Sequence, residues 1–265
     1  MKKLALITGA TSGLGLSYAA YFASQGYDLI VTGRRREALF SNGKKWREQY
    51  HVNVETILVE LSDREEVRRL IEHVGDREID MLVNNAGFGL KPVFADTSEE
   101  EMERILSLQV WCVTKLTHFV LQRMLRRNTG GIINISSDGA FAVLPHNVLY
   151  SSTKLYILNF TEGLHLELAG TGIQVQAVCP GFIDSHFHES AGMNVDKKKK
   201  GLFGFRQPDE IVRDAMKDWR KGKVVSVPDR GAKLIRVLAR VLPRTFFYRM
   251  AAGFSKSITG KKSPQ

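Results

Sequence analysis

The chain has 265 residues, of which 43% are hydrophobic and 25% are charged. This composition is typical of a folded soluble protein and excludes a disordered one, and the length suits one α/β domain or two small ones. No apolar run approaches the roughly 20 residues that a membrane-spanning helix needs. The first apolar run stops after Ile7, which is too short for a secretory signal, so we expect a cytoplasmic protein. Cys112 and Cys179 are predicted to be buried thiols, because two cysteines make neither a disulfide framework nor a metal cluster.

The positive charge is concentrated in the C-terminal quarter of the chain. The net charge is +10, and residues 197–265 hold 19 basic and 5 acidic residues. The first 196 residues hold 19 basic and 23 acidic residues. The basic character therefore says little about the main body of the protein. No stacking or groove-reading motif accompanies this charge, so nucleic-acid binding is not expected.

Short β-like runs alternate with helical stretches over the first two thirds of the chain. The expected strands are Leu4–Thr8, Asp28–Thr32, Val54–Leu61, Met81–Val83, Gly131–Ile135 and Ile173–Val178. The expected helices are Leu16–Gln25, Arg35–Tyr50, one that begins at Ser62, a long one that begins at Ser98, and Val148–Leu168. Both serines precede a glutamate by three residues, the spacing of a capping box. The alternation predicts a doubly wound α/β fold, a parallel sheet with helices on both faces and ligands at the carboxyl ends of its strands.

A glycine-rich turn follows the first expected strand. Its sequence is Thr8-Gly9-Ala10-Thr11-Ser12-Gly13-Leu14-Gly15. Glycines permit a tight turn and let backbone amides and a helix N-terminus approach a pyrophosphate, so the turn is interpreted as a dinucleotide loop. The alternative is a plain turn. The candidate cofactor-binding residues here are Gly9, Thr11, Ser12, Gly13, Leu14 and Gly15.

Four further motifs follow in order along the chain. They are Asn84-Asn85-Ala86-Gly87, Asn134-Ile135-Ser136-Ser137, Tyr150-Ser151-Ser152-Thr153-Lys154, and Pro180-Gly181. With the G-x-x-x-G-x-G spacing of the first turn, they resemble the short-chain dehydrogenase/reductase family over residues 3–190. The resemblance implies a Rossmann-like catalytic domain that binds a nicotinamide cofactor and assembles as a homodimer or homotetramer. We expect this domain at residues 1–225 and a basic amphipathic extension at residues 226–265.

Tyr150 and Lys154 lie four residues apart, and hence on one face of an expected helix. The ordinary tyrosine pKa of about 10 is too high for a base at neutral pH, and a nearby ammonium group is expected to lower the pKa of Tyr150. Tyr150 is then able to donate a proton to a carbonyl oxygen, or to remove one from an alcohol in the reverse reaction.

The resemblance implies further roles near this pair. Lys154 would also hold the nicotinamide ribose, and Ser137, 13 residues before Tyr150, would bind the reacting oxygen. Similar enzymes usually carry an Asn 28 residues before this serine, and Gln109 stands there in this chain. We expect Gln109 to serve the proton relay of that Asn, and the alternative is that it is only a helix residue.

Cofactor choice is predicted from the end of the second strand. An acidic residue there would hydrogen-bond the adenosine ribose and repel a phosphate, but this chain has Gly33. Arg34 follows and is able to grip a 2′-phosphate, with Arg35 as a helper, so NADP(H) is expected. The alternative is a solvated helix start. By resemblance, the other cofactor contacts are Glu60 and Leu61 at the adenine, Asn85, Ala86 and Gly87 after the fourth strand, and Pro180, Gly181, Ile183 and Ser185 after the sixth.

Substrate identity is expected to depend on residues 186–206, the variable lid of similar proteins. Phe187 and Met193 indicate an apolar wall, which Phe88–Leu90 and Val143–Pro145 would complete. A hydrophobic carbonyl or alcohol therefore fits better than a sugar or an acid. The run Lys197–Lys200 is interpreted as a solvated loop, or as an attraction for the phosphates of an acyl carrier.

The C-terminal segment has the pattern of a basic amphipathic helix. Its apolar positions are Leu234, Val237, Leu238 and Val241, and its basic positions are Lys233, Arg236, Arg240 and Arg244. Three interpretations stay open. The helix covers the protein's own core, lies on an anionic membrane surface, or docks on a partner.

These observations together predict an oxidoreductase that transfers a hydride between NADP(H) and a hydrophobic carbonyl compound or secondary alcohol. The first alternative is a non-catalytic NADP(H)-binding sensor whose basic tail docks on a membrane or partner. The second alternative keeps the enzyme but takes the carbonyl of an acyl thioester as substrate.

Overall fold

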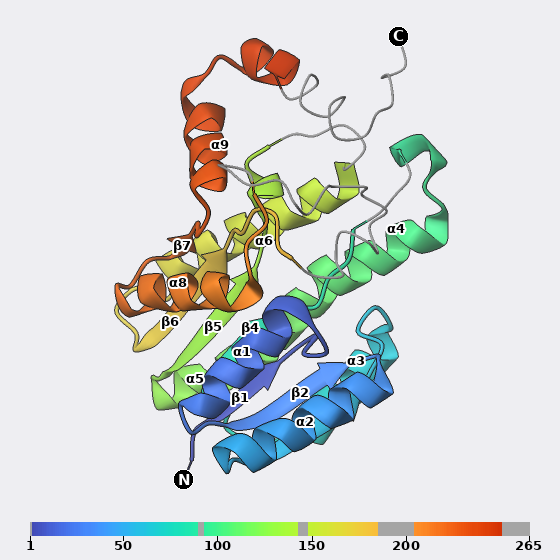
Figure 1. Ribbon diagram of the computed structural model, residues 1–265, viewed down its shortest axis with the longest axis vertical. Coiled ribbons are helices and arrows are strands. Elements are labelled where there is room, and N and C mark those ends of the chain that lie inside the picture. The colour runs from blue at the N-terminus through green and yellow to red at the C-terminus, as the bar shows by residue number, and fades with distance from the viewer. Residues whose placement is uncertain (1, 90–92, 143–147, 185–203, 251–265) are drawn as a thin grey trace.

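The computed structural model describes residues 2–89, 93–142, 148–184 and 204–250, which form a seven-stranded parallel sheet between two layers of helices (Figure 1). The strands are β1 (Leu4–Ile7), β2 (Asp28–Gly33), β3 (Val54–Leu58), β4 (Met81–Asn84), β5 (Gly130–Ile135), β6 (Ile173–Val178) and β7 (Val225–Ser226). Their order across the sheet is β3-β2-β1-β4-β5-β6-β7, and every neighbouring pair is parallel. The order reverses between β1 and β4, which confirms the doubly wound fold.

The main helices alternate with the strands and divide between the two faces of the sheet. They are α1 (Gly13–Ser24), α2 (Arg36–Tyr50), α3 (Arg64–Val74), α4 (Glu99–Leu106), α5 (Val113–Arg127), α6 (Val148–Glu167), α8 (Pro208–Arg220) and α9 (Arg230–Val241). Buried side chains of α1, α2 and α8 form one apolar cluster with the sheet, and those of α3, α5 and α6 form the other. Because consecutive strand residues point to opposite faces, Leu6 belongs to one cluster and Ile7 to the other.

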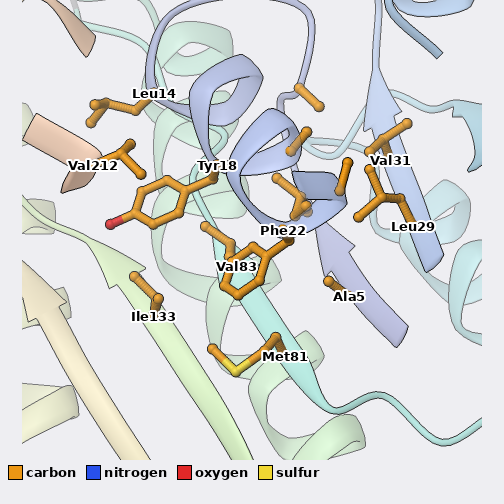
Figure 2. Packing of buried hydrophobic residues seen from close by; sticks show 14 of the residues in the cluster. Ala5, Leu14, Tyr18, Phe22, Leu29, Val31, Met81, Val83, Ile133 and Val212 are labelled. Atoms are coloured by element: carbon orange, nitrogen blue, oxygen red, sulfur yellow. The ribbon is translucent and has the colours of Figure 1, made fainter. Parts of the chain in front are cut away.

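Tyr18 and Phe22 anchor α1 to the first of these faces. Both rings are almost completely buried, and Figure 2 shows them above Val83 and Met81. Full burial of a large apolar side chain contributes about 1.5–3 kcal/mol. This packing holds α1 over the sheet with its N-terminus at the carboxyl ends of the strands. Cys112 and Cys179 are buried free thiols, as predicted.

The two expected capping boxes have different outcomes. Ser98 caps α4, because its hydroxyl accepts from the Glu101 amide while the Glu101 carboxylate accepts from the Ser98 amide. The prediction of a capping box at Ser62 was wrong. Its hydroxyl instead donates to Glu60 Oε1 at 2.7 Å, so Asp63 becomes the cap residue of α3 and accepts from two amides of its first turn.

The long helix expected from Ser98 is divided by a π-helical segment, η2 (Ser107–Cys112). It separates α4 from α5 and contains Gln109. Short π segments cost hydrogen-bond quality and often mark functional positions. The amphipathic pattern alone did not indicate this break, since the apolar spacing continues through it.

Two elements near the C-terminus were not predicted from the sequence. The helix α8 begins after Gln207, with a proline in its first turn, and covers α1. The two-residue strand β7 pairs with β6 through Ala177 and Val178. The expected division between residues 225 and 226 falls inside β7, and a separate extension remains a prediction. Within the described ranges, no helix is both long and apolar enough to cross a membrane.

Candidate active site

The glycine-rich turn lies between β1 and α1, with Gly9 and Gly13 at φ values of +70° and +57°. L side chains rarely adopt these values, so glycine suits both positions. Ser12 precedes the helix with an extended backbone, and its side chain makes no capping hydrogen bond. The N-terminal amides of α1 are therefore left to be satisfied by water or by a ligand, and their dipole favours an anion.

Asn85 closes the other side of this turn. Its side-chain amide donates to the carbonyl oxygens of Thr8 and Gly9 at 2.9 and 3.1 Å. A Cβ atom on Gly15 would lie 2.3 Å from the Gly9 oxygen and 2.4 Å from Asn85 Nδ2, so no other residue fits there. The amides of Asn85 and Ala86 donate to Thr8 Oγ1. These hydrogen bonds thus join the turn after β1 to the residues that follow β4.

Gly33 ends β2 beside the same turn. A Cβ atom on Gly33 would lie 2.4 Å from Thr11 Cγ2, so Thr11 would have to shift to admit a side chain there, including the aspartate typical of NAD-binding sites. Arg35 donates to Thr11 Oγ1 at 3.1 Å. The structure therefore brings Thr11, Gly33 and Arg35 together at one edge of the turn.

Arg34 and Glu60 form an ion pair of 2.9 Å at the surface. Burial would raise the pKa of Glu60, but hydrogen bonds from Ser62 and Arg34 outweigh it and lower that pKa. Since β3 ends at Leu58, Glu60 lies in the following turn, and Leu61 is buried behind it. In this structure Glu60 faces Arg34, and exposed pairs of this kind are weak enough for a phosphate to displace.

Ser137, Tyr150 and Lys154 meet where β5 and α6 adjoin. Ser137 is buried, and its hydroxyl accepts from the Gly139 amide and donates to Asp138 Oδ1, each at 3.1 Å. Ser137 and Tyr150 share a hydrogen bond between their side chains. Lys154 Nζ lies 5.5 Å from the centroid of the Tyr150 ring. The three residues expected to carry the chemistry are thus neighbours.

Lys154 is held firmly at the base of the site. Its side chain is 3% exposed, and Nζ donates to the Ile135 carbonyl at 2.9 Å. The Ser136 hydroxyl donates to the Lys154 carbonyl at 2.7 Å and ties α6 to the end of β5. Burial lowers the pKa of Lys154 to about 8, because the protein interior disfavours the ammonium.

The expected lowering of the Tyr150 pKa is not found in this structure. Burial raises the pKa of Tyr150 well above its ordinary value, the hydrogen bond with Ser137 opposes that effect, and the charge of Asp138 adds to it. The desolvation of the phenolate therefore outweighs any help from Lys154. In this state Tyr150 is a proton donor at neutral pH.

Gln109 points into the same site from the π-helical segment. Its side chain is fully buried, its Nε2 donates to the Phe88 carbonyl at 2.7 Å, and its Oε1 accepts from Thr153 Oγ1 at 3.4 Å. A Cβ atom on Gly87 would lie 3.5 Å from Lys154 Nζ and 3.6 Å from Gln109 Oε1. The Gln109 amide and the Lys154 ammonium therefore both lie beside Gly87.

Asp138 and Asp229 form an acidic pair that the sequence motifs did not indicate. Asp229 Oδ2 accepts from the Gly181 amide at 2.8 Å, and the Asp138 amide donates to the Pro180 carbonyl at 2.8 Å. Burial raises the pKa of Asp138 to about 6, and the charge of Asp229 adds to this effect. Arg206 lies 3.9 Å from Asp229 and compensates part of its charge. The signal in the sequence was only a charged residue directly after Ser137.

A second missed feature is a buried amide network behind the site. Asn84 Nδ2 donates to Asn134 Oδ1 at 2.8 Å and to Thr117 Oγ1 at 3.0 Å. Asn134 Nδ2 donates to Thr161 Oγ1 at 2.9 Å. These bonds satisfy groups that would be costly to bury alone, and they join β4 and β5 to α5 and α6.

The remaining predicted residues lie at the end of β6 or outside the described ranges. Ile183 forms a parallel bridge with Arg206, which joins the two ends of the expected lid. Ser185, most of the lid including the Lys197–Lys200 run, Leu90 and the segment Val143–Pro145 lie outside the described ranges. Among residues that the structure describes, no group of three His, Cys, Asp or Glu side chains is placed to hold a metal ion.

Three known proteins are similar to this chain over most of its length. Very-long-chain 3-oxoacyl-CoA reductase of Anas platyrhynchos is 32% identical over 217 residues, which cover 80% of this chain and 67% of that protein. The structure of a short-chain dehydrogenase from Sphingobium yanoikuyae in complex with NADPH is 27% identical, with a TM-score of 0.80 over 99% of this chain and 97% of the other. A bulky-bulky ketone specific alcohol dehydrogenase from Comamonas testosteroni is 26% identical, with a TM-score of 0.76 over the same shares.

The family profile described as short chain dehydrogenase matches residues 3–196. This range contains the glycine-rich turn, the buried site at β5 and α6, and the strand order that places both at one edge of the sheet. The chain therefore belongs to the short-chain dehydrogenase family and is an oxidoreductase that uses a nicotinamide cofactor.

Proposed function

We propose that the protein uses NADPH to reduce a hydrophobic ketone or aldehyde, with Ser137, Tyr150 and Lys154 as its catalytic residues. The observation that carries this proposal is the close arrangement of these three side chains, of which Ser137 and Lys154 are buried and Tyr150 is partly buried. Ser137 and Tyr150 share a hydrogen bond, and the Lys154 ammonium lies 5.5 Å from the tyrosine ring. Titratable groups gathered in this way are typical of catalytic sites.

Each of the three residues has a distinct task. The Ser137 hydroxyl donates a hydrogen bond to the carbonyl oxygen of the substrate and fixes its position. The Tyr150 hydroxyl then delivers its proton to that oxygen as negative charge develops there. Lys154 stabilises the phenolate left on Tyr150. The raised pKa of Tyr150 favours this direction, because a protonated tyrosine is ready to act as an acid.

The described residues fit a dinucleotide. The N-terminus of α1, with Ser12 uncapped and Gly13, Leu14 and Gly15 in its first turn, would hold the pyrophosphate. The other residues that would line the cofactor are Gly9, Leu61, Asn85, Ala86, Gly87, Lys154, Pro180, Gly181 and Ile183. When bound, the cofactor supplies the hydride for the reduction.

NADP(H) is favoured over NAD(H) at the end of β2. An acidic side chain at Gly33 would require Thr11 to shift, and Arg34 and Arg35 follow the same position. A 2′-phosphate would exchange the exposed ion pair between Arg34 and Glu60 for a charge-assisted contact with the phosphate. Glu60 would then hold Arg34 only until the phosphate binds, whereas the resemblance implied a contact between Glu60 and the adenine.

Gln109 is proposed as a positioning residue for proton supply. Its Oε1 and the Lys154 ammonium both lie next to Gly87, so one water molecule between them would complete a path to Lys154. The hydrogen bond to the Phe88 carbonyl holds the amide orientation.

A hydrophobic substrate is supported by the names of two similar proteins, one acting on very-long-chain 3-oxoacyl-CoA and one on bulky ketones. The first of these also supports the acyl-thioester alternative. A cytoplasmic location, a homodimer or homotetramer, and contact of the C-terminal segment with a membrane surface complete the proposal.

The test measures binding of NADPH and NADH, and then NADPH oxidation with a panel of apolar ketones, aldehydes, diketones and 3-oxoacyl thioesters. Tyr150→Phe is the control. Turnover that prefers NADPH and requires Tyr150 is expected. Tight NADPH binding without Tyr150-dependent turnover on any panel member would favour the non-catalytic sensor, and failure to bind either nucleotide would exclude both functions.

A further inference from the structure

The helix α9 and the helical residues 244–250 form a C-terminal arm that leaves several large apolar side chains exposed, whereas Phe247 is buried. Figure 1 shows α9 rising from the end of β7 away from the sheet, with the second helical stretch beyond it. Val237 and Val241 are 56% and 75% exposed, and Phe246 is 56% exposed. Within α9, Gly231 and Ala232 are the buried residues. Ala232 joins a buried apolar cluster at the base of the helix, but Val237 and Val241 do not cover the protein's own core.

The exposed apolar side chains of α9 share one face of the helix. Leu234, Val237 and Val241 follow each other at intervals of three and four residues, which places them on a single stripe. Beyond Pro243, Phe246 and Tyr248 are also exposed. So many large apolar side chains exposed in one short segment often mark a site of contact with a membrane or a partner.

This surface is bordered by positive charge alone. Residues 230–250 contain six basic residues and no acidic residue, and the basic positions are Arg230, Lys233, Arg236, Arg240, Arg244 and Arg249. Lys233, Arg236 and Arg240 follow a stripe next to the apolar one. Long basic side chains beside an apolar face are able to reach anionic headgroups while the apolar side chains enter the acyl region.

We propose that the C-terminal arm docks on an anionic lipid bilayer. The positive charge of the arm favours an anionic bilayer over a second copy of the arm as its binding partner. A second copy of the arm would bring two strongly cationic surfaces together, which like-charge repulsion opposes. A bilayer of anionic lipids matches both features at once, because its surface attracts basic side chains and the aromatic residues suit the interface.

The base of the arm lies at the proposed active site. Asp229 immediately precedes α9 and accepts from the amide of Gly181. The Arg236 guanidinium lies 5.7 Å from the ring of Phe141, which follows the η3 turn (Asp138–Ala140) after Ser137. Docking of the arm would therefore bring the bilayer close to the turn that follows Ser137. This step rests on the proposed function, and it assigns the substrate to carbonyl compounds that dissolve in the bilayer.

The experiment is co-sedimentation of the full chain with vesicles of phosphatidylglycerol and phosphatidylcholine, at low and high salt. We expect binding to phosphatidylglycerol vesicles that salt weakens, and little binding to pure phosphatidylcholine. Arg240→Glu/Arg244→Glu should weaken the partition at least about tenfold, and Phe246→Ser several-fold. The matched controls are Lys44→Glu/Lys45→Glu and Phe40→Ser on α2, whose side chains are exposed and should leave binding unchanged.

Three results would overturn the docking proposal. They are no binding to either vesicle, equal binding by arm and control variants, and an arm-dependent change of oligomeric state without vesicle binding. Turnover of a water-soluble ketone, measured without vesicles, tests the proposed function separately. A ketone that partitions into phosphatidylglycerol vesicles should be reduced several-fold faster by the unchanged chain than by Phe246→Ser, and equal rates would exclude delivery from the bilayer.

Discussion

The catalytic end of the sheet and the C-terminal arm depart from the usual distribution of side chains in opposite directions. At the catalytic end, the Lys154 ammonium is buried, and the Tyr150 phenol and the Asp138 carboxyl group are partly buried. On the arm, Val237 and Val241 face solvent. Both arrangements cost stability, because one desolvates polar groups and the other leaves apolar surface in water. We interpret each region as one that binds a partner outside the chain, a cofactor and substrate at the catalytic end and a bilayer at the arm.

The largest expected effect is that of Tyr150→Phe on turnover. The ring stays in place and the proton donor is lost, so kcat should fall by about 10²- to 10⁴-fold. NADPH affinity and the free energy of unfolding should change little, which fluorescence titration and urea denaturation would check. If kcat stayed within a factor of ten, the Tyr150 hydroxyl would have no part in proton transfer.

Asp138→Asn should show that the partly buried carboxyl group lowers the free energy of unfolding when it is ionised. Its pKa is raised from 3.8 to about 6, so the folded state binds the proton more tightly than the unfolded state does. Stability from this group is therefore complete below about pH 4 and is lost as the pH rises through 6. The asparagine variant lacks this loss. As the pH rises from 4 to 8, its free energy of unfolding should therefore increase by at most about 3 kcal/mol relative to that of the unchanged chain.

Urea denaturation at several pH values measures this difference. Asp229→Asn is a companion variant, since the charge of Asp229 contributes to the raised pKa of Asp138. A stability difference that stayed constant from pH 4 to pH 8 would contradict the assignment.

Arg34→Ala should separate the two nicotinamide cofactors. The loss of a charge-assisted phosphate contact is expected to weaken NADPH binding about 10- to 100-fold and to leave NADH binding nearly unchanged. Glu60→Gln should act in the opposite direction, because it frees Arg34 from its ion pair. Isothermal titration with both nucleotides measures these changes, and equal losses for NADPH and NADH would remove Arg34 from 2′-phosphate recognition.

Gln109→Ala should lower kcat by about tenfold and change its pH profile, because proton supply to Lys154 would be interrupted. Gln109→Asn keeps the amide and should recover part of the rate. A merely structural role would affect stability and leave the pH profile as it is. Steady-state kinetics from pH 6 to pH 9 would distinguish the two.

The smallest effect is expected on the arm. Val237→Ser should change the free energy of unfolding by less than about 0.5 kcal/mol, because the side chain is already exposed. Val178→Ser, at the buried end of β6, should cost about 2 kcal/mol or more. A large loss for Val237→Ser would show that the arm is packed and would remove the contrast between the two regions.

Local pattern was sufficient for much of the fold and for the position of the site. The alternation of strands and helices predicted six of the strands close to their observed bounds, since a buried parallel strand needs a short continuous apolar run. Motif spacing was sufficient for the glycine-rich turn and for Tyr150 and Lys154, because these residues are close in sequence and their geometry is set by one turn or one helix. The strand β7 was not predicted, because a strand of two residues is too short to show a periodic pattern.

Tertiary structure decided what depends on neighbours distant in sequence. Ser62 does not cap α3, because its hydroxyl donates to the Glu60 carboxylate, and Asp63 is the cap residue instead. The Tyr150 pKa rises, rather than falls, because a desolvation penalty depends on everything that encloses the ring. The exposure of Val237 and Val241 is likewise invisible in a helical pattern, since the same amphipathic stripe packs on a core or faces outward. A sequence records which groups are present, whereas burial and charge balance arise only when distant segments meet.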